Sequence, residues 1–200
     1  MRITRTIRPL ALGAVLLSSA CMEMGDASSS APASLPVMQW DHHPQSAAWT
    51  EATLEALRDE GAILASTVPM DVAEFCPTYA EASPEDRRAF WAGLFSAIAR
   101  YESTWNPQAV GGGGRYFGLL QISPRTADYV GCDLSEGGLK DGETNLECAV
   151  RIAANRAPEE GGLVRGPGAL AGLVNDWGPM HDPAKVATIS AWTRSQSYCQ

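Results

Sequence analysis

The sequence lacks long apolar runs and the short motifs by which proteins commonly hold metal ions. Its clearest apolar run, residues 10–17, is too short to cross a bilayer, which takes roughly 20 apolar residues, and no later run is long enough either. CxxC and HxxxH pairs, the spacings at which zinc is commonly bound, are both missing. We therefore expect no permanent membrane span, no metal ion and no cofactor.

The first twenty residues have the layout of an export signal. Three arginines precede the apolar run, and small residues follow it. Ser18 and Ala20 suit ordinary signal peptidase, whereas the same small residues before Cys21 resemble a bacterial lipobox. In that box, leucine is usual where this sequence has Ser18. Both cleavage sites remain open, and we favour lipidation of Cys21.

Positive charge is scarce once such a signal is removed. The signal takes three of the 15 basic residues and none of the 23 acidic ones, so 12 − 23 leaves a net charge of −11. A surface of this kind repels nucleic acid backbones and anionic headgroups. We therefore expect no nucleic acid partner, and contact with a membrane only through the lipid on Cys21.

Five cysteines make an odd set, and a lipidated Cys21 leaves four that can pair in an oxidising compartment. Cys132 and Cys148 bracket a glycine-rich loop, which a disulfide would restrain. Cys76 and Cys199 would then join the start of the domain to its end. Four cysteines permit three pairings, and the sequence alone does not choose among them.

The remaining chain predicts a mainly α domain over residues 46–200, preceded by a flexible tether over 21–45 that is rich in Ser, Ala and Pro. No segment shows the sustained two-residue alternation of a half-buried strand. Caps and turn residues predict the helices. The first predicted helix runs from Thr50 to about Glu60 and is ended by Gly61, and the second is capped by Ser83 and runs to about Ser103. Further helices are predicted over 123–130, after a cap formed by Thr144 with Glu147, and, as short helices, over 168–174 and 183–193.

Glu102 stands out on the helix capped by Ser83. It continues the three-and-four spacing of the apolar residues Trp91, Leu94, Phe95 and Ile98, so its side chain should point where the core side chains point. Burial raises the pKa of a carboxyl group, and a pKa near neutrality suits a general acid. On spacing alone, however, a carboxylate that caps a helix or pairs with a surface arginine is the commoner case.

The neighbouring motifs favour the catalytic interpretation. Glu102-Ser103 is followed by Trp105-Asn106-Pro107, a run of four glycines, and then the segment FGLLQISPRTA over 117–127. This pattern resembles the domain of bacterial soluble lytic transglycosylases, which share the goose-type lysozyme fold in glycoside hydrolase family 23. The resemblance implies an enzyme with a lysozyme-like, two-lobed helical domain and a glycan-binding cleft whose substrate is peptidoglycan.

The resemblance also implies which residues form the site. Glu102 matches the catalytic acid, and Ser103 matches the serine beside it. The second motif, whose backbone and glutamine line the cleft in the family, is matched by Gly118, Leu119, Leu120, Gln121 and Ile122. Tyr116 is a candidate cleft wall. In place of the family's Ala-Tyr-Asn-Ala-Gly motif stands LVNDWGPM over 173–180, where Asn175, Asp176 and Trp177 are candidates for its asparagine. Trp177 fits either a cleft wall or the core.

In this family a single glutamate cleaves the MurNAc-β-1,4-GlcNAc bond and forms 1,6-anhydroMurNAc. Two other functions remain open from the residues. A hydrolytic muramidase would need Asp176 or Asp128 opposite Glu102. A non-catalytic peptidoglycan-binding lipoprotein would need no acid at all. The expected location is the periplasm, with a lipid anchor in the outer membrane.

Overall fold

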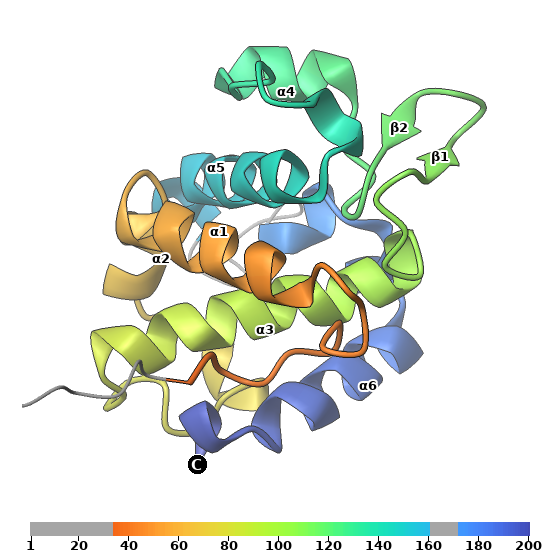
Figure 1. Cartoon of the computed structure of the whole chain (residues 1–200). Coiled ribbons are helices and arrows are strands. Elements are labelled where there is room, and N and C mark those ends of the chain that lie inside the picture. The colour runs from red at the N-terminus through yellow and green to blue at the C-terminus, as the bar shows by residue number, and fades with distance from the viewer. Residues whose placement is uncertain (1–33, 161–171) are drawn as a thin grey trace, which may run out of the picture. The chain divides into compact units, whose positions relative to one another are not determined.

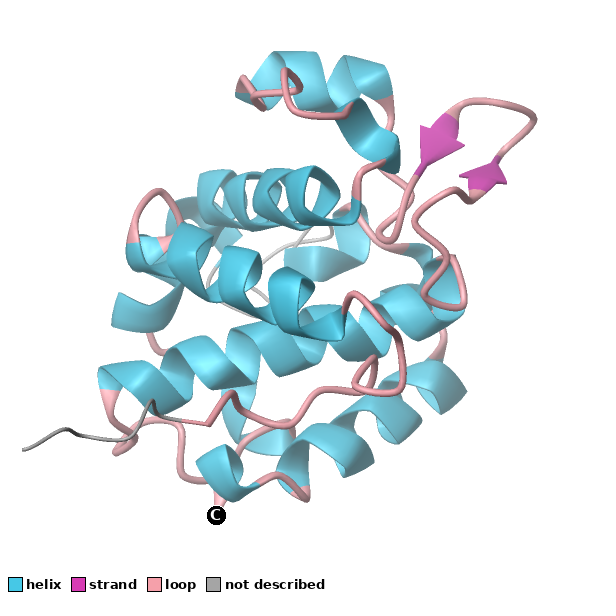
Figure 2. Ribbon diagram, in the orientation of Figure 1, coloured by secondary structure: helices cyan, strands magenta, loops and turns pink. Residues whose placement is uncertain are grey.

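The computed structural model describes residues 34–160 and 172–200, and the compact body that it describes is mainly helical (Figures 1 and 2). The α-helices are α1 (Ser46–Arg58), α2 (Ala62–Ser66), α3 (Pro84–Glu102), α4 (Pro124–Val130), α5 (Gly142–Glu160) and α6 (Pro183–Arg194). Short 3-10 helices are η1 (Val72–Glu74), η2 (Gly138–Lys140), η3 (Gly172–Asn175), η4 (Gly178–His181) and η5 (Ser197–Cys199). Two antiparallel strands, β1 (Val110–Gly111) and β2 (Tyr116–Phe117), form a hairpin.

The long helix α3 is the centre of the arrangement. It packs against α1, α2, α6, η4 and η5, while α5 packs on α1, α2 and α4. Figure 1 shows the C-terminal end of α3 and the N-terminal end of α6 on the same side of the molecule, with the β1–β2 hairpin projecting above them. The end of α3 is thus the place where several elements meet.

Helix α3 is buried on all sides over residues 89–99 rather than on one face. We expected an amphipathic helix from its spacing; a helix that neighbours cover all round instead carries apolar or small residues throughout. Gly93 shows why a small residue is needed, because a Cβ atom there would lie 2.2 Å from Tyr198 Oη. Glu102 is the last residue of this buried helix, so the helix delivers a carboxylate to the edge of the core.

Cap chemistry explains most of the helix boundaries that the sequence predicts. Ser83 Oγ accepts the backbone N–H of Asp86 at the start of α3, and Ser123 Oγ accepts that of Thr126 at the start of α4. Asp182 does the same for Ala184 at the start of α6. These three helices begin where we predicted.

Two predicted helix starts are wrong. Helix α1 begins at Ser46, not at Thr50, because Thr50 is needed inside the helix, where its buried hydroxyl accepts the indole N–H of Trp40 at 2.9 Å. Helix α5 begins at Gly142, where Asp141 Oδ1 accepts the backbone N–H of Thr144 at 2.9 Å. Thr144 is therefore within the first turn and is not the cap.

Two further predictions at helix ends need correction. Helix α1 stops at Arg58, slightly before the predicted end at about Glu60, and the N–H of Gly61 closes its last turn by donating to Ala56 O at 2.8 Å. A Cβ atom on Gly61 would lie 2.3 Å from Val150 Cγ1. Of the short helix expected over 168–174, residues 168–171 lie outside the described part, and Gly172–Asn175 is a 3-10 helix.

The folded body begins at Ser34, earlier than the predicted boundary at residue 46. Met38 and Trp40 are buried in the core, and Trp40 packs edge-on against Trp49 with ring centroids 6.0 Å apart. Residues 34–45 are therefore part of the domain and not of a tether. The predicted signal over 1–20, Cys21 and the tether up to residue 33 lie outside the described residues.

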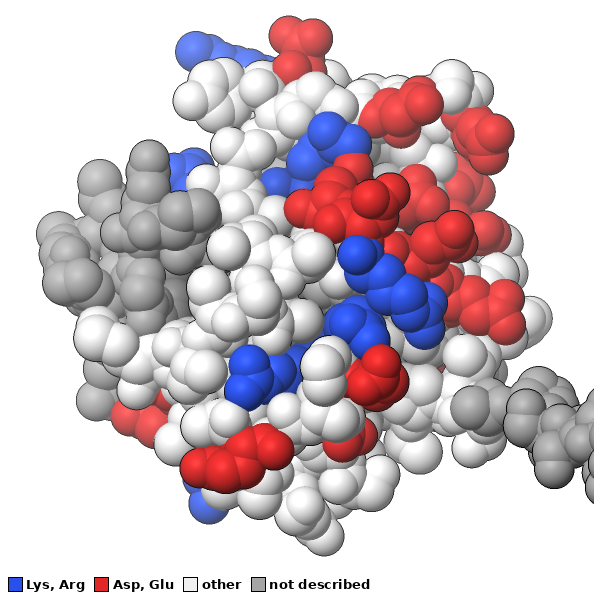
Figure 3. Space-filling model, turned by 90° about the vertical axis from the view of Figure 1, so that its left-hand side faces the viewer, with Lys and Arg blue, Asp and Glu red and all other residues white. Residues whose placement is uncertain are grey.

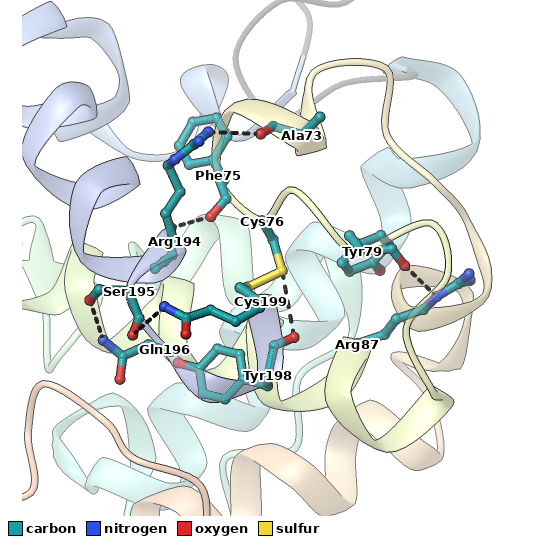
Figure 4. Close-up of a disulfide and its surroundings, with 12 residues drawn as sticks. Ala73, Phe75, Cys76, Tyr79, Arg87, Arg194, Ser195, Gln196, Tyr198 and Cys199 are labelled. Carbon is teal, nitrogen blue, oxygen red and sulfur yellow. Dashed lines mark hydrogen bonds between the residues drawn. A yellow bond between two sulfur atoms is a disulfide. The ribbon is translucent and has the colours of Figure 1, made fainter.

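Both predicted disulfides are present, Cys132–Cys148 and Cys76–Cys199. Figure 4 shows that the second one joins the segment after η1 to the last residues of the chain. Two hydrogen bonds strengthen the same junction. Thr193 Oγ1 donates to Phe75 O at 2.7 Å, and Arg194 Nη1 donates to Ala73 O at 3.0 Å.

Acidic side chains gather on one side of the face drawn in Figure 3, with basic side chains interspersed among them. Burial raises the pKa of Glu147, and the carboxylates of Glu60, Glu143, Glu136 and Asp141 raise it further. Among the described residues, no helix combines the length and the apolar character that a membrane crossing requires.

Candidate active site

Glu102 lies half-buried at the C-terminal end of α3. Burial raises the pKa of its carboxyl group from 4.5 to about 7, while the nearby Lys185 ammonium and a hydrogen bond from the Gly178 backbone moderate this rise. A carboxyl group in this state is partly protonated at neutral pH. It can therefore both donate and accept a proton, which is what general acid-base catalysis requires.

The chain leaves α3 through an unusual backbone. Thr104 and Trp105, directly after the helix, have positive φ angles of 53° and 56°, a conformation that residues other than glycine rarely adopt. The turn is held by Trp105, whose indole N–H donates to Ser96 O at 2.8 Å. This exit fixes the direction in which the chain continues from Glu102 towards the β1–β2 hairpin.

The second predicted motif, residues 118–122, is built into the core. The side chains of Leu119, Leu120 and Ile122 are buried, so any contact of these residues with a ligand would come from their backbone. Gly118 has φ +80°, and a Cβ atom there would lie 2.1 Å from Leu139 O. Only glycine fits this close approach.

Asn145 holds this motif in place, and sequence reasoning missed it. Its side chain is fully buried on α5. Its Oδ1 accepts the N–H of Leu120 at 2.8 Å, and its Nδ2 donates to Phe117 O at 3.0 Å and to Leu139 O at 2.9 Å. The signal that could have found it is the one that singled out Glu102, a polar residue among the buried positions of a helix.

Gln121 is also occupied within the protein. It has a positive φ of 47°, and its Nε2 donates to Gly118 O at 2.9 Å and to Ala109 O at 3.4 Å. A Cβ atom on Gly111 would lie 2.2 Å from Gln121 Oε1, so the amide lies against the base of the hairpin. Gln121 thus supports the loop between the two motifs through its amide nitrogen. Within the described part of the chain, its amide oxygen accepts no hydrogen bond.

The segment 173–180, predicted as a divergent third motif, lies between the first two motifs. Trp177 Nε1 donates to Leu120 O at 3.1 Å, and the backbone of Gly178 donates to the Glu102 carboxyl group. All three motifs of the sequence are thereby brought together around Glu102.

Trp177 packs in the core. Its side chain is only 2% exposed and packs edge-on against Phe95 with ring centroids 5.7 Å apart. A ring so covered has no free face on which a sugar could stack. Trp177 also contributes to the lining of the pocket beside the motifs, where it is covered by its neighbours.

A pocket of about 220 Å³ lies beside these motifs. Its polar lining comes from the hairpin, from the second motif, from the segment 173–180 and from the start of α4. The polar residues are Tyr116, Gln121, Ser123, Thr126, Asn175 and Asp176. Tyr116 is 41% exposed on the hairpin, and Asn175 is exposed on η3. Tyr116 and Asn175, two of the predicted substrate-binding residues, therefore have exposed side chains beside this pocket. Glu102 is not among the lining residues of this pocket.

Ser103, the residue after the candidate acid, is half-buried, and its hydroxyl group donates to Ala99 O at 3.2 Å.

Asp176 and Asp128, the two candidates for a second carboxylate opposite Glu102, differ in their surroundings. Asp176 is half-buried and pairs with Arg156 at 3.4 Å, and burial raises its pKa. Asp128 is exposed on α4. Among the described residues, no group of three or more His, Cys, Asp or Glu side chains is placed to hold a metal ion.

Comparisons with known proteins agree with this architecture. Residues 80–164 match the family described as the transglycosylase SLT domain. Three solved structures, titled Bd0314 DslA, share the fold with a TM-score of 0.74, and the match covers 84% of this chain and 100% of theirs. One is a wild-type form at 25% identity, and two are variants with a glutamate changed to glutamine, at 26% and 25% identity. The comparison with curated proteins found no match.

The match to the family covers Glu102, the second motif and all of α5, which are the elements described above. An SLT domain implies a glycan-cleaving enzyme family with peptidoglycan as its substrate. Residues 80–164 thus resemble a transglycosylase SLT domain, and the chain has a mainly α, lysozyme-like fold that it shares with DslA.

Proposed function

We propose that this protein is a peptidoglycan lytic transglycosylase in which Glu102 is the sole proton-transfer residue. The observation that carries the proposal is the state of Glu102, a half-buried carboxyl group at a helix end with a pKa raised to about 7. Its place beside residues 118–122 and 173–180 supports the same assignment, since these segments would hold the glycan around it.

The reaction needs no second carboxylate. Glu102 first donates its proton to the glycosidic oxygen as the bond from that oxygen to C1 of MurNAc breaks. The Glu102 carboxylate then takes the proton of the MurNAc 6-hydroxyl group as its oxygen bonds to C1, which closes the 1,6-anhydro ring and restores the acid. The substrate supplies its own nucleophile, so the enzyme must position the chain rather than activate water.

Hydrolysis by a second carboxylate is the alternative, and the arrangement favours it less. The sequence has no Asp or Glu between Glu102 and Asp128. Asp128 is exposed on α4, and Asp176 is engaged with Arg156. A water-activating base must lie opposite the acid across the scissile bond, and neither residue is an evident candidate for it.

The test compares the wild-type protein with Glu102→Gln on purified sacculi, and identifies released muropeptides by mass. General acid-base catalysis is typically worth about 10² to 10⁴-fold; because one group serves both steps, we expect a loss near 10⁴-fold or more. The exposed Glu51 on α1 provides a matched control, Glu51→Gln, which should keep full activity. A folded Glu102→Gln variant with more than about a tenth of wild-type activity would show that Glu102 is not the acid.

The products separate the alternatives. Anhydro ends are expected for the transglycosylase, and reducing ends would instead indicate a hydrolytic muramidase. Binding to sacculi without release of any muropeptide would indicate a non-catalytic binding protein.

We further propose that the protein works in the periplasm, anchored to the outer membrane by a lipid on Cys21. Support comes from the two disulfides, which use every cysteine of the described part and are typical of exported proteins. The arrangement of residues 1–21 in the sequence supports the same location.

A further inference from the structure

The two disulfides differ in how far solvent reaches them. Cys76 and Cys199 are both buried, with exposed fractions of 0% and 1%. In the other bridge Cys148 is 2% exposed, but Cys132 is only half-buried. Cys132 and Cys148 also line a pocket of about 240 Å³. One end of this bridge is therefore open to a small molecule, whereas the Cys76–Cys199 bridge is closed.

The pocket over the open bridge is rich in acidic side chains. It lies between the end of α1, the segment after α4 and the middle of α5. Its charged residues are Glu55, Asp59, Glu60, Asp133, Glu147 and Arg151. Arg151 pairs with Glu60. Five carboxylates face one guanidinium group, so the surroundings of the bridge are negative.

The same bridge fastens the elements that hold the second motif. Cys132 ends α4, since its backbone N–H donates to Ala127 O at 2.9 Å, and α4 begins directly after the motif. The bridged loop also contains Leu139, whose carbonyl group accepts Asn145 Nδ2 at 2.9 Å. Asn145 in turn accepts the N–H of Leu120 at 2.8 Å. Opening the bridge would therefore free both supports of the motif.

We propose that Cys132–Cys148 is a redox-sensitive bridge, which small thiols open from the acidic pocket and whose opening loosens the second motif. A thiolate attacks Cys132 Sγ, because Cys148 is covered. The S–S bond breaks, and Cys148 Sγ leaves with the electron pair and takes up a proton. A second thiolate then attacks the reagent's sulfur in the mixed disulfide. Two thiols are thus oxidised to one disulfide, and both cysteines are reduced.

The acidic lining selects among thiols by their charge. A negative potential retards anionic molecules and attracts cationic ones, over a range of about 8 to 10 Å at moderate salt. At equal thiolate concentration and low salt, cysteamine, whose amino group is cationic, should react at least about tenfold faster than 2-mercaptoethanesulfonate. Added salt should reduce this ratio.

The first experiment treats the full mature protein with the neutral thiol 2-mercaptoethanol under native conditions. Free thiols are alkylated at intervals and located by peptide mass mapping. Cys132 and Cys148 should be labelled at least about tenfold faster than Cys76 and Cys199, because a closed bridge reacts only when the structure around it opens. Equal rates would mean that both bridges react through unfolding, and would overturn the proposal.

The second experiment compares the two charged thiols on a variant with both Asp59→Asn and Glu147→Gln. The ratio of the cysteamine rate to the sulfonate rate should fall several-fold, because two of the five carboxylates lose their charge. The control is Glu81→Gln, since Glu81 is exposed and lies outside the pocket. A ratio that is the same in the wild type and the folded double variant overturns the selection by charge.

The third experiment follows amide hydrogen exchange in a variant with both Cys132→Ser and Cys148→Ser. The Leu120 amide should exchange roughly tenfold to a hundredfold faster, a range that loss of a bridge over a loop of this length allows. The amide of Phe75, which donates to Val72 O beside the other bridge, is the control and should not change. An unchanged Leu120 amide, or an equal rise at Phe75, overturns the link to the motif. None of these measurements needs a glycan, so the outcome is independent of the proposed function.

Discussion

Replacement of Glu102 by glutamine should stabilise the protein at alkaline pH and leave its stability nearly unchanged at acidic pH. The folded state raises the pKa of this carboxyl group from 4.5 to about 7. Between these values the native state binds more protons than the unfolded state, so the free energy of unfolding falls as the pH rises through this window. Above pH 7 the full penalty of a buried carboxylate is present in the wild type. Glutamine never carries that charge.

The size of the effect follows from the same pKa values. A difference of about 2.5 pKa units corresponds to about 3.4 kcal/mol at 1.36 kcal/mol per unit. Glu102 is only half-buried, and water on its exposed side screens the charge, so we expect a gain of about 1 to 3 kcal/mol at pH 8. For a body of this length, 1 kcal/mol moves the melting temperature by roughly 2 to 4 °C. The variant should therefore melt about 2 to 12 °C higher than the wild type at pH 8.

The assay is differential scanning calorimetry of both proteins at pH 4, 6 and 8, with Glu51→Gln as the control for an exposed glutamate on a helix. Other carboxylates titrate over this range in every variant, so the difference between variant and wild type isolates Glu102. A difference in melting temperature that is the same at pH 4 and pH 8 would refute the argument. It would mean that burial does not keep the Glu102 carboxyl group protonated near neutral pH.

Two further predictions concern the cysteines. Alanine at both Cys76 and Cys199 should destabilise the protein more than alanine at both Cys132 and Cys148, because the bridges span 123 and 16 residues of sequence. In the chain-entropy model the two bridges contribute about 5 and about 3 kcal/mol to the free energy of unfolding. Urea unfolding of the two double variants would measure these losses, and an equal or reversed order would contradict the model. Mass spectrometry of the envelope-associated protein should find a lipid on Cys21, and an unmodified mature N-terminus would reject the proposed anchor.

The sequence predicts those parts of the fold that local chemistry determines. A side chain accepts a backbone N–H at the start of three helices, and that interaction needs only neighbours in sequence; the residues are Ser83, Ser123 and Asp182. Thr50 shows the limit of the same reasoning. Its hydroxyl group is bound by Trp40, a contact that depends on how the segment before α1 folds back on the helix. A cap signal cannot reveal that its residue is needed elsewhere.

The candidate site divides in the same way. Glu102 is visible in the sequence because its spacing sets it on the buried side of a helix, and the resemblance of its surroundings to a known family gives it a role. The contact of Gly178 with Glu102 is not visible, because tertiary packing brings its backbone N–H to the carboxyl group from far along the chain. Trp177 was ambiguous because an indole ring suits a cleft and a core equally well, and its packing against Phe95 is a tertiary contact that the sequence does not reveal.

The position of the second motif relative to Glu102 depends on buried polar contacts and not on the apolar packing around them. Asn145 on α5 holds the backbone of residues 117–120, and Trp177 binds the carbonyl group of Leu120. The residue after Trp177 then contacts the carboxyl group of Glu102 through its backbone. Hydrophobic contacts tolerate sliding, whereas a buried amide with three partners is satisfied in one arrangement only, because each unmade bond costs about 1 to 3 kcal/mol. The core residues of this protein therefore supply its stability, while Asn145 and Trp177 set the position of the second motif relative to Glu102.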